Sequence, residues 1–266
     1  MSNNKFKNFF KLGLEEIEKL IEKEFYSKKT EYHPLLFEAM EYSLFSGGKR
    51  VRPILVKWVS ELGNPDPLKL SKAAAAIEYL HTYSLIHDDL PAMDDDSERR
   101  GKPSSHIVYG EAVAILAGDG LLTEAFRLLG EAGDARLAEI LGRDAGAGGM
   151  VGGQVADILR EEEIEDINEL KTARLFRAGS LLGGIVGDFD DNSLDKISLY
   201  GINLGKAFQL KDDILDEETE DAKKTLDQAR KYVDEALKAL EEVRFNGCKS
   251  KEKLESLACF MISRDK

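Results

Sequence analysis

The sequence is poor in cysteine, proline and histidine, and it has no long uncharged apolar run. Its two cysteines, Cys248 and Cys259, are too few for a disulfide framework among 266 residues, and they have neither the spacing nor the partners of a zinc site. No apolar stretch approaches the length of a membrane span, and residues 1–11 lack the apolar core and cleavage site of a signal peptide. These absences lead us to expect a cytoplasmic protein without stable membrane insertion.

Positive charge is also scarce, since 37 lysines and arginines stand against 50 acidic residues and the net charge is -13. Such an acidic chain is a poor non-specific binder of nucleic acid or of anionic lipid, so we expect no nucleic-acid partner. The cations nevertheless gather in two basic groups, Lys49-Arg50 with Arg52 and Arg99-Arg100. Groups of this size suit a small anionic ligand, although ion pairing at the surface would produce the same pattern.

Hydrophobic residues recur at helical spacing along nearly the whole chain. Between Phe6 and Phe25 they return every three or four residues, which marks one face of a helix, and the alternation typical of strands is nowhere convincing. No linker rich in glycine, serine and proline divides the chain. We therefore expect an all-α fold in which residues 1–266 form a single domain, with about ten helices packed around a common core. After the first helix, the others are expected at residues 35–45, 53–62, 67–89, 111–131, 134–160, 167–187, 193–218, 221–243 and 250–263.

A densely acidic segment follows the apolar stretch at residues 73–86. Six carboxylates lie between Asp88 and Glu98, and such a cluster destabilises a protein unless positive charge lies among its members. Pro91 is expected to end or bend the preceding helix, which would allow Asp94 to return toward Asp88. A single acidic run is most often a solvated face, so this cluster alone does not identify a site.

A second acidic cluster ends another apolar stretch, at residues 204–210. Asp212 and Asp216 are four residues apart and share one face of a helix. Carboxylates without nearby histidine or cysteine favour hard divalent cations, and magnesium commonly shares its site with substrate phosphates. Two acidic clusters at the ends of apolar helices, together with the basic groups, therefore indicate a diphosphate bound through magnesium.

In its motifs the chain resembles the trans-isoprenyl diphosphate synthases, and most closely the bacterial farnesyl diphosphate synthases. The order and spacing fit from about residue 35 to residue 218, and several independent motifs take part. The matching motifs are Gly47-Gly48-Lys49-Arg50-Val51-Arg52-Pro53, His81, Asp88-Asp89-Leu90-Pro91-Ala92-Met93-Asp94, Arg99-Arg100-Gly101, Gly152-Gly153-Gln154, Lys171-Thr172, Phe208-Gln209 and Asp212-Asp213-Ile214-Leu215-Asp216.

This resemblance implies a helical bundle of the isoprenoid synthase type, with a deep central cavity and the two aspartate motifs facing each other across its mouth. It implies a homodimeric enzyme that joins isopentenyl diphosphate to an allylic diphosphate, dimethylallyl or geranyl, with farnesyl diphosphate as the expected product. A synthase of another chain length, such as geranylgeranyl, and a non-catalytic subunit of the same fold are the alternatives. Such subunits generally lose aspartates from one motif, and this chain keeps both.

The resemblance also assigns roles to individual residues. Magnesium, about three ions per active site, would help the diphosphate to leave, and no side-chain base is required because the released diphosphate can take the proton. The implied metal ligands are Asp88, Asp89, Asp94, Asp95, Asp212, Asp213 and Asp216. The implied catalytic residues are Asp88, Asp94, Arg99, Lys171 and Asp212. The implied contacts to the allylic substrate are Arg99, Lys171, Thr172 and Gln209, and those to isopentenyl diphosphate are Lys49, Arg52, His81 and Arg100.

Product length is expected to depend on Tyr83 and Ser84. Tyr83 lies five residues before Asp88, roughly 7 Å back along the helix axis. In the family, a bulky aromatic residue at this position closes the floor of the cavity and limits chain growth, and this pair resembles the farnesyl pattern. Ordinary core packing would also account for the tyrosine.

Some features depart from the family pattern, and others would suit a different kind of protein. The connection after Asp216 is short by about twenty residues relative to the family, which puts in doubt a lid over the pocket and one phosphate-contacting lysine. The segment at residues 129–145 is also several residues short. The glycines between residues 146 and 153 lack the Lys-Ser/Thr ending of a phosphate loop, so close helix packing is the simpler interpretation.

His87-Asp88 would suit a metal phosphohydrolase, but only His33, His81 and His106 remain as further ligands. A helical scaffold with acidic surfaces would not account for the basic groups.

Overall fold

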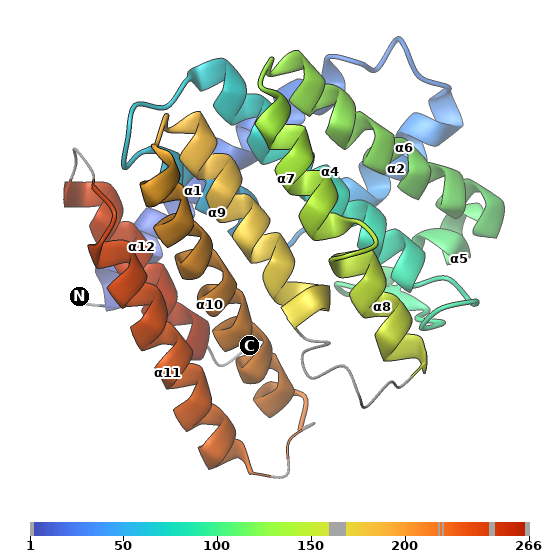
Figure 1. The fold of residues 1–266 in the computed structure, drawn as a ribbon. Helices are drawn as coiled ribbons and strands as arrows, with labels where there is room; N and C mark the ends of the chain where they lie inside the picture. The colour runs from blue at the N-terminus through green and yellow to red at the C-terminus, as the bar shows by residue number, and fades with distance from the viewer. Residues whose placement is uncertain (1–2, 160–168, 218, 220, 245–247, 264–266) are drawn as a thin grey trace.

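The computed structural model describes residues 3–159, 169–217, 219, 221–244 and 248–263, and Figure 1 shows them as a bundle of helices. The expected all-α fold is confirmed. Within the described ranges the elements are, in chain order, α1 (Asn3–Tyr26), α2 (Pro34–Leu44), α3 (Val51–Ser60), α4 (Pro67–Asp88), β1 (Glu98–Arg99), β2 (Lys102–Pro103), α5 (Ser105–Tyr109), α6 (Glu111–Glu131), α7 (Ala135–Ala145), α8 (Met150–Leu159), the π-helical turn η1 (Glu169–Ala173), α9 (Arg174–Val186), α10 (Asp191–Leu215), α11 (Ala222–Glu241) and α12 (Cys248–Ser263).

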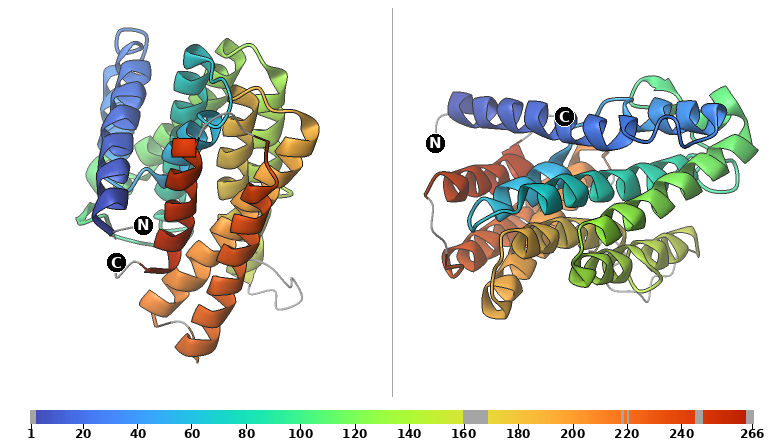
Figure 2. Two further views of the ribbon diagram at one scale, coloured as in Figure 1. Left: turned by 90° about the vertical axis from the view of Figure 1, so that its left-hand side faces the viewer. Right: turned by 90° about the horizontal axis from the view of Figure 1, so that it is seen from above.

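Helix α4 occupies the middle of the bundle. It contacts α1, α2, α3, α6, α7 and α9, and Figure 2 shows it between the N-terminal helices and the layer that contains α7 to α9. Residues 73–77 are four alanines and an isoleucine, all 0% exposed, as expected for a helix that is apolar on every side. The Asp66 carboxylate accepts hydrogen bonds from the backbone N–H groups of Leu68 and Lys69 and so caps the first turn.

Helix α10 runs in the same general direction as α4, and both end at the lower end of the bundle in Figure 1. The Asp190 carboxylate caps α10 by accepting a hydrogen bond from the Ser193 N–H at 2.8 Å. Helix α9 lies between them, since it contacts both α4 and α10. Because each of the two helices ends in aspartates, the fold carries both acidic motifs to the same end of the bundle.

The single helix expected over residues 134–160 is wrong. The described part of this segment forms two helices, α7 and α8, around a turn at residues 146–149. A side chain at Gly149 would collide with the backbone oxygen of Asp144, so the turn requires glycine there. At Gly153, an added Cβ would lie 2.6 Å from the amide nitrogen of Lys171, which shows how closely α8 approaches η1. This geometry agrees with helix packing rather than a phosphate loop.

Two short elements do not follow from the hydrophobic periodicity. Helix α5 is one of them, and the other is the antiparallel hairpin of β1 and β2. The two-residue turn of the hairpin consists of Arg100 and Gly101, with φ angles of 56° and 75°, as a type I′ turn requires.

Residues 160, 167, 168 and 218, at the ends of expected helices, lie outside the described residues. None of the described helices is both long enough and apolar enough to cross a membrane.

Candidate active site

The first aspartate motif begins where α4 ends. Pro91 cannot continue the helix, and the chain turns back so that the Asp94 N–H donates to the Asp88 backbone oxygen at 2.9 Å. Asp94 and Asp95 are exposed, whereas Asp88 is half-buried. The turn thus brings Asp94 back beside the end of α4, as the position of Pro91 predicts.

The carboxyl group of Asp88 has a pKa that is raised from 3.8 to about 6. Burial is the main cause, and the charges of Asp94 and Asp89 add to the rise, while those of Lys171 and Arg99 oppose it. Asp88 and Lys171 line the same cavity, so α4 and η1 present opposite charges to one site. An ionised carboxylate in this position is destabilised, and a cation beside it would relieve the destabilisation.

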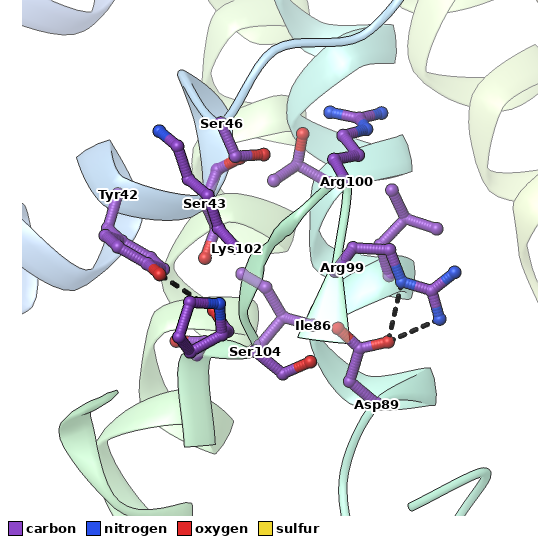
Figure 3. A pocket seen from close by; sticks show the side chains of 13 residues that line it. Tyr42, Ser43, Ser46, Ile86, Asp89, Arg99, Arg100, Lys102 and Ser104 are labelled. Atoms are coloured by element: carbon purple, nitrogen blue, oxygen red, sulfur yellow. Dashed lines mark hydrogen bonds and ion pairs between the residues drawn. The ribbon is translucent and has the colours of Figure 1, made fainter. Parts of the chain in front are cut away.

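Asp89 is engaged by an arginine. Its carboxylate, in a residue that is 3% exposed, accepts hydrogen bonds from Arg99 Nε at 2.8 Å and from Arg99 Nη2 at 2.5 Å. Arg99 also donates to Asp96 at 2.8 Å. In Figure 3, at a small cavity of about 30 Å³, Arg99 leaves the hairpin toward Asp89, whereas Arg100 leaves it in another direction. The structure therefore brings Asp89 to Arg99, a pairing that the sequence did not indicate.

The second aspartate motif occupies the last turn of α10 and is tied to η1. Thr172 Oγ1 donates to Gln209 Oε1 at 2.7 Å, and Gln209 Nε2 donates to Asp213 Oδ1 at 2.8 Å. Burial raises the pKa of Asp213, the hydrogen bond from Gln209 opposes the rise, and the charge of Asp216 adds to it. Two predicted substrate contacts and one predicted metal ligand thus form a connected group.

A cavity of about 390 Å³ lies between α4, α8 and the segment formed by η1 and α9. Tyr83 and Ser84 both line it, and the Tyr83 ring stands edge-on to His87 with the ring centroids 5.5 Å apart. Charged and apolar groups together suit a ligand with an anionic head and a hydrocarbon chain. The polar lining includes Arg52, His81, Asp88, Lys171 and Thr172, and the apolar lining includes Met93, Met150, Val155, Ile158 and Leu175.

A second cavity, of about 290 Å³, adjoins the first because Arg52 and His81 line both. Its lining contains both residue types expected of a site for an anion beside a hydrocarbon. The basic side chains belong to Lys49, Arg50, Arg52 and Arg100, and the rings to Phe176 and Phe208. All four residues predicted to contact isopentenyl diphosphate, which are Lys49, Arg52, His81 and Arg100, are therefore brought together in one cavity.

Arg52 and His81 form the wall between the two cavities. Burial lowers the pKa of His81 well below 6.5, and the charge of Arg52 adds to this effect, so the imidazole is neutral at neutral pH. A neutral ring can accept a hydrogen bond from Arg52 Nη1, which lies 3.2 Å from His81 Nε2. Burial also lowers the pKa of Arg52 to about 10, while the charges of Glu78 and Asp212 oppose it. Asp212 therefore acts on a side chain that lines both cavities.

The acidic residues fit a divalent cation that is bound together with a ligand. Among the residues that the structure describes, no three histidine, cysteine, aspartate or glutamate side chains form a metal site by themselves. Magnesium usually keeps several waters and shares its site with phosphates, so it needs fewer carboxylates than a site closed by protein ligands alone. Two buried donors, Arg52 Nε and Gln154 Nε2, have no hydrogen-bond partner within the described ranges, as expected where an acceptor-rich ligand binds.

Two acids that hold neighbouring cations were missed by sequence reasoning. Asp157 accepts a hydrogen bond from Lys171 Nζ at 2.5 Å, and Glu78 accepts one from Arg50 Nη1 at 2.7 Å. Asp157 follows Gln154 by three residues, so the two share a face of α8, and Glu78 precedes His81 by three residues on α4. Helical spacing from each motif residue could therefore have identified both acids.

The chain is similar in sequence and in fold to known proteins. The family model described as polyprenyl synthetase matches residues 33–230. The farnesyl diphosphate synthase of Geobacillus stearothermophilus is 45% identical over 205 residues, which cover 72% of this chain and 69% of that protein. Geranylgeranyl pyrophosphate synthase 12 of Arabidopsis thaliana is 42% identical over 229 residues, covering 78% and 64%. The structure of geranylgeranyl pyrophosphate synthetase from Pyrococcus horikoshii matches with a TM-score of 0.86 at 28% identity, covering 98% of this chain and 99% of that one.

Proposed function

The chain belongs to the polyprenyl synthetase family, and from that premise we propose that it joins isopentenyl diphosphate to an allylic diphosphate and that its product is farnesyl diphosphate. The observation that supports this proposal best is the pair of adjoining cavities. One combines an apolar wall with Asp88 and Lys171, and the other contains Lys49 and Arg100. Such a pair suits two diphosphates whose hydrocarbon parts must meet.

The allylic diphosphate would lie with its chain along the apolar wall and its diphosphate beside Lys171 and Thr172. In the first step the bond between its C1 atom and the diphosphate oxygen breaks, and both electrons leave with the diphosphate. Negative charge then grows on that oxygen, where the Lys171 ammonium can donate a hydrogen bond. Lys171 would exchange its contact with Asp157 for one with the diphosphate.

Magnesium, when bound, would supply further positive charge beside the departing diphosphate. We propose that Asp89 holds Arg99 beside the end of α4 instead of binding the metal, because Arg99 already engages that carboxylate. Asp95 is exposed in the turn and stays a candidate ligand. The other ligands that we propose are Asp88, Asp94, Asp212, Asp213 and Asp216, for about three ions per site.

In the second step the double bond of isopentenyl diphosphate attacks the allylic carbon, and a new carbon–carbon bond forms. The resulting cation then loses a proton, which the released diphosphate can accept, so that the charge balances. Lys49, Arg52 and Arg100 would hold the isopentenyl diphosphate, with the neutral His81 accepting from Arg52. The apolar wall would keep water away from the cation before it is attacked.

The experiment that tests this proposal is incubation with isopentenyl and geranyl diphosphates, with magnesium and after its removal by a chelator. We expect a fifteen-carbon product with magnesium, almost none after chelation, and recovery when excess magnesium chloride is added. Products are read by chain length after removal of the diphosphate. Phosphate release without chain growth would contradict the proposal and would favour a hydrolase.

The chain also carries an exposed apolar face on α5 and α6, and we propose that a second copy covers it in a homodimer. Ile107 is 55% exposed, Ile115 42% and Leu116 57%, and Val108 beside Ile107 is 46% exposed. Large exposed apolar side chains that lie near one another commonly mark an interaction surface. We expect sedimentation velocity to give the mass of two chains, and a single-chain mass at micromolar concentration would contradict this.

A cytoplasmic location is our further proposal, since Cys259 is an exposed free thiol and suits reducing conditions.

A further inference from the structure

A buried ion pair lies in the wall of the second cavity, which holds Lys49, Arg52 and Arg100, and it has no part in the chemistry described above. Arg50 Nη1 donates to Glu78 Oε1 at 2.7 Å, and the two side chains are 1% and 2% exposed. Glu78 lies on α4 one turn before His81, and Arg50 is the residue that precedes α3. The pair therefore joins the central helix to the start of the helix that carries Arg52.

Arg50 holds an unfavourable backbone conformation at this point. Its φ and ψ angles are 48° and 34°, in the left-handed region that a residue with a side chain seldom adopts. Its guanidinium is fixed from two sides, because Nη2 also donates to the backbone oxygen of Leu44 at 2.6 Å. Since Arg50 stands between Lys49 and Arg52, its conformation sets the directions in which these two cations leave the backbone.

The charge of Glu78 reaches the other cations of the cavity as well. Burial lowers the pKa of Arg52 and of Arg100, and in both cases the charge of Glu78 is the largest influence in the opposite direction. Arg100 also donates to the backbone oxygen of Gly47, which connects the β1–β2 hairpin to the same loop. Among the described residues that line this cavity, Glu78 is the acidic one.

We propose that Glu78 is a positioning residue, whose buried carboxylate fixes Arg50 and thereby presents Lys49 and Arg52 to isopentenyl diphosphate. This inference rests on the proposed function. It accounts for a carboxylate placed under a site for a dianion, where its charge by itself opposes binding. The carboxylate is needed because a buried guanidinium that has lost its partner is strongly destabilised, and Arg50 would otherwise leave its place.

Positioning and simple charge predict opposite effects when the carboxylate is neutralised. If Glu78 acted only through its charge, Glu78→Gln would make the cavity more positive and would tighten the binding of isopentenyl diphosphate. If Glu78 positions Arg50, the same change releases the loop and weakens binding. The direction of the change in KM therefore separates the two roles.

The experiment measures steady-state constants for both substrates in the wild-type chain and in Glu78→Gln. We expect the KM for isopentenyl diphosphate to rise about tenfold or more, and the KM for geranyl diphosphate to stay within about twofold. The matched control is Glu24→Gln, because Glu24 on α1 is another buried carboxylate and is 6% exposed. It accepts hydrogen bonds from two residues of α4, Ser71 Oγ at 2.6 Å and Lys72 Nζ at 2.7 Å. The control should lose stability without any change in either KM. An unchanged or lower KM for isopentenyl diphosphate in Glu78→Gln would overturn the proposal.

A second variant covers the case in which Glu78→Gln does not fold. Replacing both partners of a buried ion pair by apolar residues of similar volume commonly keeps the fold, so Arg50→Met combined with Glu78→Leu retains packing and loses the fixed guanidinium. We expect the same rise of about tenfold in the KM for isopentenyl diphosphate, and a KM within about twofold of wild type would refute the positioning role. The wild-type chain is measured in parallel. If the wild-type chain elongates no substrate, the proposed function is overturned. If the wild-type chain is active and the variants keep its KM for isopentenyl diphosphate, only the role of Glu78 is overturned.

Discussion

Replacing Asp88 by alanine is expected to lower turnover about a thousandfold, which corresponds to roughly 4 kcal/mol in the activation barrier. Asp88 and Lys171 both line the larger cavity, and no other acidic residue lines that cavity among the described residues. Its loss removes a proposed ligand for the cation that neutralises the leaving diphosphate. Asp212→Ala is expected to have an effect of the same order, because Asp212 acts on the shared Arg52 from the opposite helix.

The measurement is the initial rate of product formation at saturating substrates, with circular dichroism to confirm that the helices persist. The matched control is Asp227→Ala, which removes an exposed aspartate of α11 that forms a surface ion pair with Arg230 at 2.9 Å. It should change turnover by less than about twofold, since surface ion pairs of this kind contribute little. Turnover near the wild-type level in Asp88→Ala or in Asp212→Ala would count decisively against the assignment.

Replacing Asp88 is also expected to change the stability of the folded chain. The pKa of Asp88 is raised to about 6 in the folded chain from an ordinary value of 3.8, so the ionised carboxylate disfavours the folded state. This destabilisation is absent below the ordinary pKa, grows between the two values and is complete above about pH 6. Asp88→Asn should therefore raise the Tm at about pH 8 and leave it unchanged near pH 4. A gain in stability with a loss of turnover is typical of a residue kept for function.

The sequence was sufficient to find the acids but not their partners. Asp88, Asp94 and Asp212 could be singled out because carboxylates clustered at the ends of apolar helices repel one another unless a cation lies among them. The hydrogen bonds from Arg99 to Asp89 and from Thr172 through Gln209 to Asp213 depend on how distant segments pack, and spacing along the chain cannot give them. Asp89 shows the consequence, since the motif alone cannot tell a metal ligand from a residue that holds an arginine.

The helices were predictable to a similar degree. Periodicity located α4 and α10 closely because both are long and carry buried apolar residues at helical spacing before their acidic ends. It failed at residues 146–149, where the turn is dictated by a backbone clash at Gly149 that depends on the three-dimensional position of Asp144. It also failed at the β1–β2 hairpin, where Arg100 takes a left-handed conformation and its guanidinium donates to Gly47 in another loop. The hydrophobic pattern along the chain therefore predicted the helices, and tertiary packing determined where they are interrupted.

Tyr83→Ala is expected to convert a fifteen-carbon product into products of twenty carbons or more. Tyr83 is 7% exposed, lines the larger cavity with Ser84, and stands edge-on to His87, so we expect its ring to block the path of a growing chain. Removing a ring from a packed wall leaves a cavity that the surrounding side chains refill only in part. Additional isoprene units could then extend past α4 toward α6.

The products of the Tyr83→Ala enzyme are separated by chain length after dephosphorylation, with isopentenyl diphosphate in excess over the allylic substrate. Tyr83→Phe is the matched control, because it keeps the ring and removes only the hydroxyl group, and it should retain the fifteen-carbon product. If Tyr83→Ala still stops at fifteen carbons, another side chain closes the cavity, and the proposal for product length fails while the condensation itself stands. If Tyr83→Phe also lengthens the product, the hydroxyl group rather than the bulk of the ring sets the limit. Relatives of this chain are named for both farnesyl and geranylgeranyl products. We expect the ring of Tyr83 to separate the two outcomes, because both would use the same diphosphate chemistry and only the depth available to the hydrocarbon would change.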